Sequence, residues 1–101
     1  MRVGFAARAL VELAELESVL SLPADTRARV RESLRTLKVF AYAGRALEGE
    51  WEPYRVWGGP WPWMLFVYEV LEDRDLVVVV TVRDARSSRS PTMPGSRPWA
   101  P

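Results

Sequence analysis

The chain has 101 residues, of which 49% are apolar and 27% are charged, and its net charge is +1. These values fit one small globular domain with a single core and exclude a wholly disordered chain. The longest apolar run, Leu76 to Val82 with one threonine, is too short to cross a bilayer as a helix, so we expect a cytoplasmic protein. Cysteine and histidine are absent, which excludes thiolate or imidazole metal sites and histidine-based hydrolases. We therefore expect no metal and no cofactor.

Charge is unevenly distributed along the chain. Residues 21–45 are mainly basic, residues 46–75 are mainly acidic, and the chain becomes basic again after residue 82. Such blocks can create a basic face on a nearly neutral protein. The pattern permits a polyanionic partner without requiring one.

The first half of the chain predicts a short strand over residues 2–5 and two helices joined by a tight turn. The first helix is expected over residues 6–20, and Pro23 then breaks it while favouring the start of the next. Glu12 and Glu15 are expected to point outward. The second helix is expected over about residues 25–43, before Gly44. The expected buried stripes are Leu10, Leu13, Leu16 and Leu20 on the first helix, and Val30, Leu34, Leu37 and Ala41 on the second.

The second half predicts strands, because proline, glycine and tryptophan replace the helical pattern after Gly44. Strands are expected over 54–57, 64–70 and 76–83 in an antiparallel meander, with the last two central in the sheet. The predicted fold class is α+β: an N-terminal strand and a two-helix hairpin packed on a three- to four-stranded antiparallel sheet. Residues 1–86 would form the single domain, and 87–101 a disordered tail rich in proline and serine.

Three local features resemble the RelE/ParE superfamily of type II toxins. Residues 44–49 resemble the "R-x-L-x-G" linker of the family, and residues 54–56 resemble the strand that follows it. Residues 66–70 with 77–82 resemble the "I-x-Y-x-V … V-x-V" strand pair. The resemblance covers roughly residues 2 to 89. It implies a growth-inhibiting toxin held inactive by a partner antitoxin.

The superfamily has two modes of inhibition, which require different residues. RelE-like members cleave ribosome-bound mRNA without a metal, and use basic and tyrosine side chains to stabilise the charged transition state. The resemblance makes Arg55, Arg83 and Arg86 the catalytic candidates. Two further basic positions fall on Trp57 and Leu65, and each missing donor would cost ~3 kcal/mol of transition-state stabilisation. ParE-like members inhibit DNA gyrase without such a set, and lose less by these departures.

Other side chains are candidates for binding. Four cations follow a helical spacing on the second predicted helix, where they would suit a phosphate backbone or an acidic antitoxin segment, although a solvated face is the simpler interpretation. Tryptophans near the first two predicted strands of the second half could form a stacking platform or a partner anchor, with core packing as the alternative. A structural role is the simpler interpretation for Tyr68. The candidate binding residues are Arg27, Arg31, Arg35, Lys38, Trp57 and Tyr68.

The resemblance also implies partners. A cognate antitoxin would cover the groove between the helical hairpin and the sheet, and the target would be DNA gyrase or the ribosome with its mRNA. No membrane partner is expected, while a homodimer and a hetero-oligomer with the antitoxin both stay open. The alternative is a non-toxic protein of the same fold that acts only as an interaction module. Enzymatic activity is expected only for the RelE-like mode.

Overall fold

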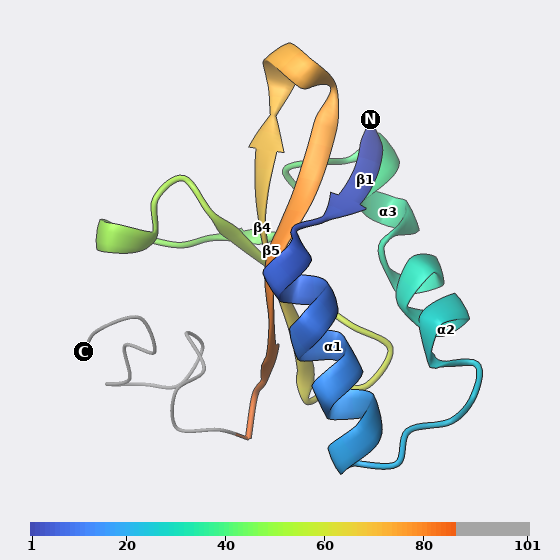
Figure 1. Cartoon of the computed structure of the whole chain (residues 1–101). Coiled ribbons are helices and arrows are strands. Elements are labelled where there is room, and N and C mark those ends of the chain that lie inside the picture. Colours follow the sequence, from blue (N-terminus) through green and yellow to red (C-terminus); the bar gives the residue numbers. More distant parts are fainter. Residues whose placement is uncertain (87–101) are drawn as a thin grey trace.

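Five strands form one mixed sheet, in the order β1-β5-β4-β3-β2, in the computed structural model, which describes residues 1–86 (Figure 1). Strands β2 to β5 pair antiparallel in sequence, whereas β1 runs parallel to β5, with Arg2 opposite Leu76 and Phe5 opposite Val79. The predicted tail of residues 87–101 lies outside the described residues. The strands are β1 (Arg2–Phe5), β2 (Arg45–Ala46), β3 (Arg55–Gly58), β4 (Met64–Leu71) and β5 (Leu76–Asp84).

The sheet confirms the α+β class and the central position of β4 and β5, but it corrects two expectations. It has five strands where three to four were expected, because the two-residue strand β2 is too short to leave a sequence pattern. It is mixed rather than antiparallel, because β1 pairs with the far strand β5 instead of with a neighbour in sequence. A four-residue apolar segment carries no information about its partner or direction.

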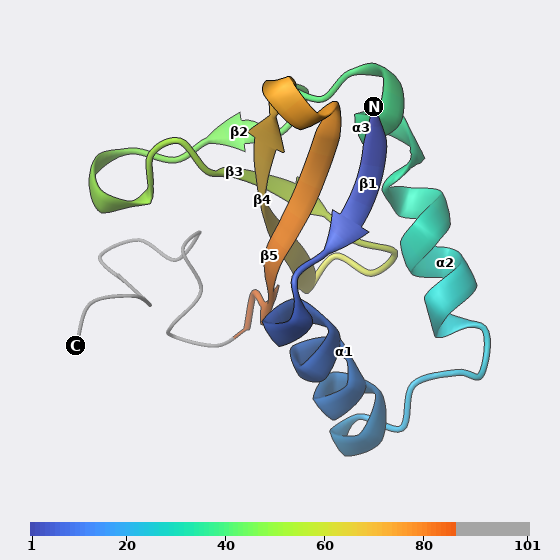
Figure 2. The ribbon, with the colours of Figure 1, turned by 45° about the horizontal axis from the view of Figure 1, so that its top comes forward.

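Three helices accompany the sheet, and α2 and α3 run beside β1 (Figure 2). Short 3₁₀ turns, η1 (Gly49–Trp51) and η2 (Glu72–Arg74), lie between strands. None of the helices within residues 1–86 is long and apolar enough to cross a membrane. The helices are α1 (Ala7–Val19), α2 (Thr26–Ser33) and α3 (Arg35–Val39).

The second helix was predicted as one segment over 25–43, and this prediction is wrong at its middle and its end. The helix breaks at Leu34 because the indole Nε1 of Trp57 donates to the Ser33 carbonyl at 2.7 Å. The Leu37 amide, which would bond to that carbonyl in a regular helix, donates instead to Leu34 at 3.0 Å. A contact from strand β3 thus divides α2 from α3. Helix α3 ends at Val39, four residues earlier than expected.

The core lies between the helices and one face of the sheet. All four residues of the stripe predicted on the second helix are buried, as expected. On α1 the stripe is shifted: Leu13 and Ala9 are buried, while Leu10 is 43% and Leu20 is 37% exposed. A smaller cluster around Val56 and Val67 occupies the other face of the sheet. Its buried members are Leu47, Val56 and Val67.

Glu12 is not turned outward, contrary to the prediction. Its Oε1 accepts a hydrogen bond from the Thr81 hydroxyl at 2.6 Å and from the Val82 amide at 3.1 Å. Strand β1 ends opposite Val79, so the edge of β5 beyond that point has no strand partner among the described residues. The carboxylate therefore satisfies an amide that would otherwise lack a partner at the sheet edge.

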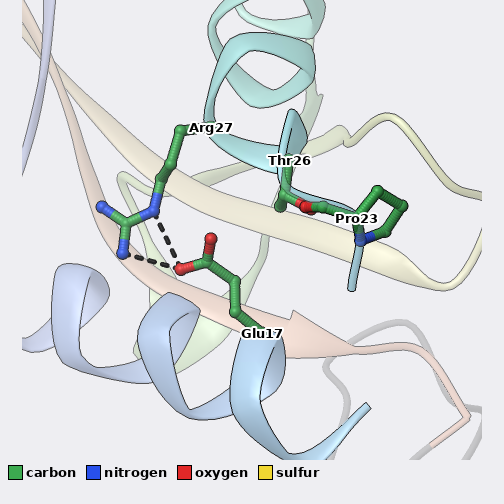
Figure 3. A network of polar contacts seen from close by, with 4 residues as sticks. All are labelled: Glu17, Pro23, Thr26 and Arg27. Atoms are coloured by element: carbon green, nitrogen blue, oxygen red, sulfur yellow. Dashed lines mark hydrogen bonds and ion pairs between the residues drawn. The ribbon is translucent and has the colours of Figure 1, made fainter. Parts of the chain in front are cut away.

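The link between α1 and α2 is held by side chains on both sides of Pro23 (Figure 3). The Thr26 hydroxyl donates to the Pro23 carbonyl at 2.6 Å, which closes the first turn of α2. The Arg27 guanidinium donates to Glu17 Oε1 at 2.9 Å through Nε and at 2.7 Å through Nη2. These contacts fix the two helices of the hairpin relative to one another.

Candidate functional site

Tyr68 on β4 is fully buried and holds the segment that follows α3. Its hydroxyl donates to the Ala41 carbonyl at 2.8 Å and accepts from the Gly44 amide at 2.9 Å. A Cβ at Gly44 would lie 2.6 Å from the Tyr68 hydroxyl oxygen and 2.6 Å from the Val56 carbonyl oxygen. Glycine is therefore required there by close approach. These bonds also explain why the second predicted helix does not reach residue 43.

Arg55 on β3 holds the same segment from its other side. Its Nη1 donates to the Gly44 carbonyl at 2.8 Å and to the Tyr42 carbonyl at 3.1 Å. The guanidinium lies 5.1 Å from the centroid of the Tyr42 ring, and the Tyr42 hydroxyl donates to the carboxylate of Glu72. This catalytic candidate is thus engaged in positioning backbone. We call Tyr42, Gly44, Arg55 and Tyr68 the Tyr68 network.

Burial raises the pKa of the Tyr68 phenol, while the hydrogen bond from the Gly44 amide and the nearby positive charge of Arg55 lower it. The hydrogen bond to Glu72 is the main cause of a raised pKa at Tyr42. Both phenols consequently stay protonated at neutral pH. In the free protein neither has the properties of a phenolate base.

Arg83 and Arg86 lie at the opposite end of β4. Arg83 stands opposite Leu65 in the pairing of β4 and β5, and its Nε is buried with no hydrogen-bond partner in the described part of the chain. Arg86 makes a two-point contact with Asp84, through Nε at 3.0 Å and Nη2 at 2.9 Å. Its hydrogen bond holds the pKa of Asp84 below the usual value.

Two of the candidate arginines, Arg55 and Arg83, do not lie on one face of the sheet, as joint action on one substrate would require. Arg55 pairs with Tyr68, which packs in the core beneath the helices. Arg83 pairs with Leu65, which packs with the cluster on the other face. Directly opposed residues share a face and alternate residues change face, so the two guanidinium groups start from opposite sides. Their partners on β4, Tyr68 and Leu65, are separated by an odd number of positions and so point to opposite faces.

The tryptophans divide between both faces. Trp57 packs on the core and bonds to Ser33, whereas Trp51 packs edge-on against Tyr54, 5.4 Å between centroids, on the other face. Trp61 and Trp63 stack in parallel, with centroids 5.8 Å apart and planes 8° apart. This placement gives Trp57 a structural contact.

The stacked pair Trp61 and Trp63 is covered at both ends by cations. Arg29 of α2 lies 5.8 Å from the Trp61 centroid, and Arg86 lies 4.7 Å from the Trp63 centroid. We call these four residues the Arg–Trp ladder. A nucleic-acid base would have to displace an arginine to stack on either ring. The ladder therefore has a structural role, which is to join α2 to the end of β5, and its rings are not free as a stacking platform.

The four cations of the second predicted helix are all exposed but differ in their contacts. Arg27 pairs with Glu17 at 2.7 Å and Arg35 pairs with Glu32 at 3.2 Å. Arg31 and Lys38 line a cleft beside β1 and have no carboxylate within 4.0 Å among residues 1–86. The stripe therefore contains two satisfied and two available cations.

Sequence reasoning missed two sets of residues that organise this surface. The only sequence signal for the Arg–Trp ladder was the close spacing of Trp61 and Trp63 around a proline. The Glu12 contact was marked by Thr81, a single polar residue inside an apolar strand that needs a buried partner. Both signals indicate that a contact exists without naming its partner.

No protein-family profile matches the sequence, and no curated protein sequence matches it significantly. Solved structures do match. A copper-bound mutant toxin from Helicobacter pylori has a TM-score of 0.64 at 19% identity and aligns over 85% of this chain and 96% of its own. YafQ from Escherichia coli has a TM-score of 0.58 at 14% identity over 85% and 96%.

The E. coli DinJ–YafQ toxin–antitoxin complex also matches, with a TM-score of 0.55 at 13% identity over 83% of this chain and 91% of that one. At these identities the likeness concerns the fold, which agrees with the resemblance found in the sequence. The chain therefore has the α+β fold of the RelE/YafQ type II toxins.

Proposed function

We propose that the chain is the toxin of a type II toxin–antitoxin system, and that a cognate antitoxin neutralises it by direct binding. The observation that carries this proposal is the fold shared with several toxin structures, among them YafQ bound to DinJ. The alignment spans nearly the whole of those toxins and most of this chain. The motifs at residues 44–49 and 66–70 support the same assignment from the sequence.

For the mode of action, the arrangement of arginines favours inhibition by binding, as in the ParE-like branch. Arg55 directs its guanidinium at the Tyr42 and Gly44 carbonyls, and Arg86 is paired with Asp84. Arg55 and Arg83 also belong to opposite faces of the sheet. A transition state stabilised jointly by these groups would require them to be free and on one side.

Cleavage of ribosome-bound mRNA is the second candidate, and one observation favours it. The Nε of Arg83 is buried without a hydrogen-bond partner in the described part of the chain. Arg83 as a whole is only partly buried, and a guanidinium with an unused donor is suited to a phosphate oxygen. In this mode Arg83 is the cation that contacts RNA, and Arg55 acts only by positioning the backbone of residues 42–44.

Growth of a bacterial host after tightly controlled induction of the full chain tests the proposal, with and without co-expression of the neighbouring open reading frame. Arrest relieved by the neighbour is the expected result. Unimpaired growth with folded, soluble protein would overturn the toxin assignment and leave the non-toxic interaction module.

The two modes are then separated in arrested cells. Gyrase inhibition predicts double-strand breaks and an SOS response with intact mRNA. The nuclease mode predicts cleavage of ribosome-bound transcripts, mapped by primer extension, which Arg83→Ala abolishes. Arg35→Ala is the matched control for loss of a positive charge, since Arg35 is exposed and its polar contact within residues 1–86 is the ion pair with Glu32 on the same helical surface.

A further inference from the structure

A small cleft lies between strand β1 and the helices α2 and α3. Its volume is about 90 Å³, and it is lined by Val3 and Phe5 of β1, by Leu34 between the helices, and by Arg31 and Lys38. We call it the β1 cleft. It has an apolar floor and two cations at its sides, and it is large enough for a side chain of a partner.

The cations of the β1 cleft lack the counter-charges that their neighbours have. Arg27, one turn before Arg31, is neutralised by Glu17 of α1 at 2.7 Å. Within residues 1–86, neither Arg31 nor Lys38 has a carboxylate within 4.0 Å. The protein therefore pairs Arg27 and Arg35 of this row internally, and leaves Arg31 and Lys38 for another source of negative charge.

The Met1 ammonium, just before β1, donates to the Lys38 carbonyl at 2.7 Å, but further along β1 two amides have no partner on the side of the cleft among residues 1–86. β1 is an edge strand of the described sheet, and the amides of Arg2 and Ala6 donate to β5, at 3.1 Å to Asp75 and 2.9 Å to Val79. Successive amides of a strand point in opposite directions, so those of Val3 and Phe5 point to the free edge. Such an edge accepts an extended segment by strand addition.

We propose that the β1 cleft binds an extended acidic segment of the antitoxin, which pairs with the edge of β1 and places a carboxylate between Arg31 and Lys38. This inference rests on the proposed function. The apolar residues Val3 and Phe5 and the open strand edge favour a polypeptide over a nucleic acid, whose phosphates would use only the two cations.

The test compares a charge-reversed variant, Arg31→Glu with Lys38→Glu, with the control Arg35→Glu. All three positions are exposed, and Arg35 lies outside the cleft. The probe is the purified protein encoded by the neighbouring open reading frame, with affinity measured by calorimetry. The neutral pair Arg31→Gln with Lys38→Gln gives a second reading if charge reversal disturbs folding, which circular dichroism checks.

The reversed variant is expected to bind at least about tenfold more weakly, and the neutral pair less so, while the control stays within about threefold of the wild type. Hydrogen exchange at Val3 and Phe5 should slow in the complex.

Unchanged affinity of the reversed variant, or unchanged exchange at Val3 and Phe5, would overturn the β1 cleft as the binding site while leaving the toxin assignment intact. Weaker binding of a single-stranded RNA, with no effect on the protein partner, would overturn it in favour of a phosphate contact. A wild-type chain that neither arrests growth nor binds the neighbour would overturn both proposals.

Discussion

The two ends of strand β4 use the same residue types, arginine and aromatic rings, with different physical consequences. At its C-terminal end the Tyr68 network is centred on a buried tyrosine, whose hydroxyl donates to the Ala41 carbonyl and accepts from the Gly44 amide, while Arg55 donates to the Gly44 carbonyl. At its N-terminal end the Arg–Trp ladder is partly exposed and relies on stacking and a surface ion pair. Buried hydrogen bonds determine the path of the backbone, because leaving their groups unpaired is costly. Exposed stacking and surface ion pairs add a little stability without determining that path.

Gly44→Ala should have the largest effect, because its Cβ would meet the Tyr68 hydroxyl and the Val56 carbonyl, both at 2.6 Å. We expect the free energy of unfolding to fall by about 3 kcal/mol, measured by urea denaturation. Gly58→Ala is the control, since a Cβ there meets no described atom within 4 Å. Equal stability of the two variants would show that the side chains and backbone around Gly44 can move to accept a Cβ with little loss of stability.

Tyr68→Phe should have the second largest effect. It leaves the buried Gly44 amide and Ala41 carbonyl without their shared partner, at a cost of about 2 kcal/mol. The folded pKa of Tyr68 lies above its unfolded value, so the wild type keeps this stability below pH 10 and loses it as pH rises through the folded pKa. Denaturation at alkaline pH should therefore show a shallower decline for the variant. Parallel declines would contradict the raised pKa.

Trp63→Leu tests the other end of β4. It keeps an apolar side chain but removes the stacking on Trp61 and the surface for Arg86. We expect a loss of about 1 kcal/mol, seen as a modest fall in melting temperature, with the Tyr68 network unchanged by NMR. A loss as large as that of Tyr68→Phe would mean that the ladder also directs the fold.

Arg86→Gln should have the smallest effect, because the guanidinium is exposed and its ion pair with Asp84 is screened by water. Arg86 lowers the folded pKa of Asp84, so the stability that it contributes is present above the unfolded pKa and is lost as pH falls through the folded pKa. Melting temperatures of the wild type and the variant should differ slightly at pH 6 and converge near pH 2. A constant difference would assign the effect to stacking on Trp63.

The elements that depend on local pattern were predictable from one amino-acid sequence. The helical spacing of Val30, Leu34 and Leu37 identified a buried face, and the apolar density of residues 64–70 and 76–83 identified the two central strands. Hydrophobic periodicity is a property of neighbouring residues, so one sequence suffices to detect it. The motifs that resemble the toxin superfamily also lie within short segments.

Contacts between distant groups could be identified only after the chain had folded. The break at Leu34 depends on Trp57, the end of α3 depends on Tyr68 and Arg55, and the inward turn of Glu12 depends on Thr81. Each of these contacts joins residues far apart in the chain. The direction of β1 and the separation of Arg55 from Arg83 follow from strand pairing. Local propensity carries no information on such contacts, because their energy arises only after the chain has closed the intervening loops.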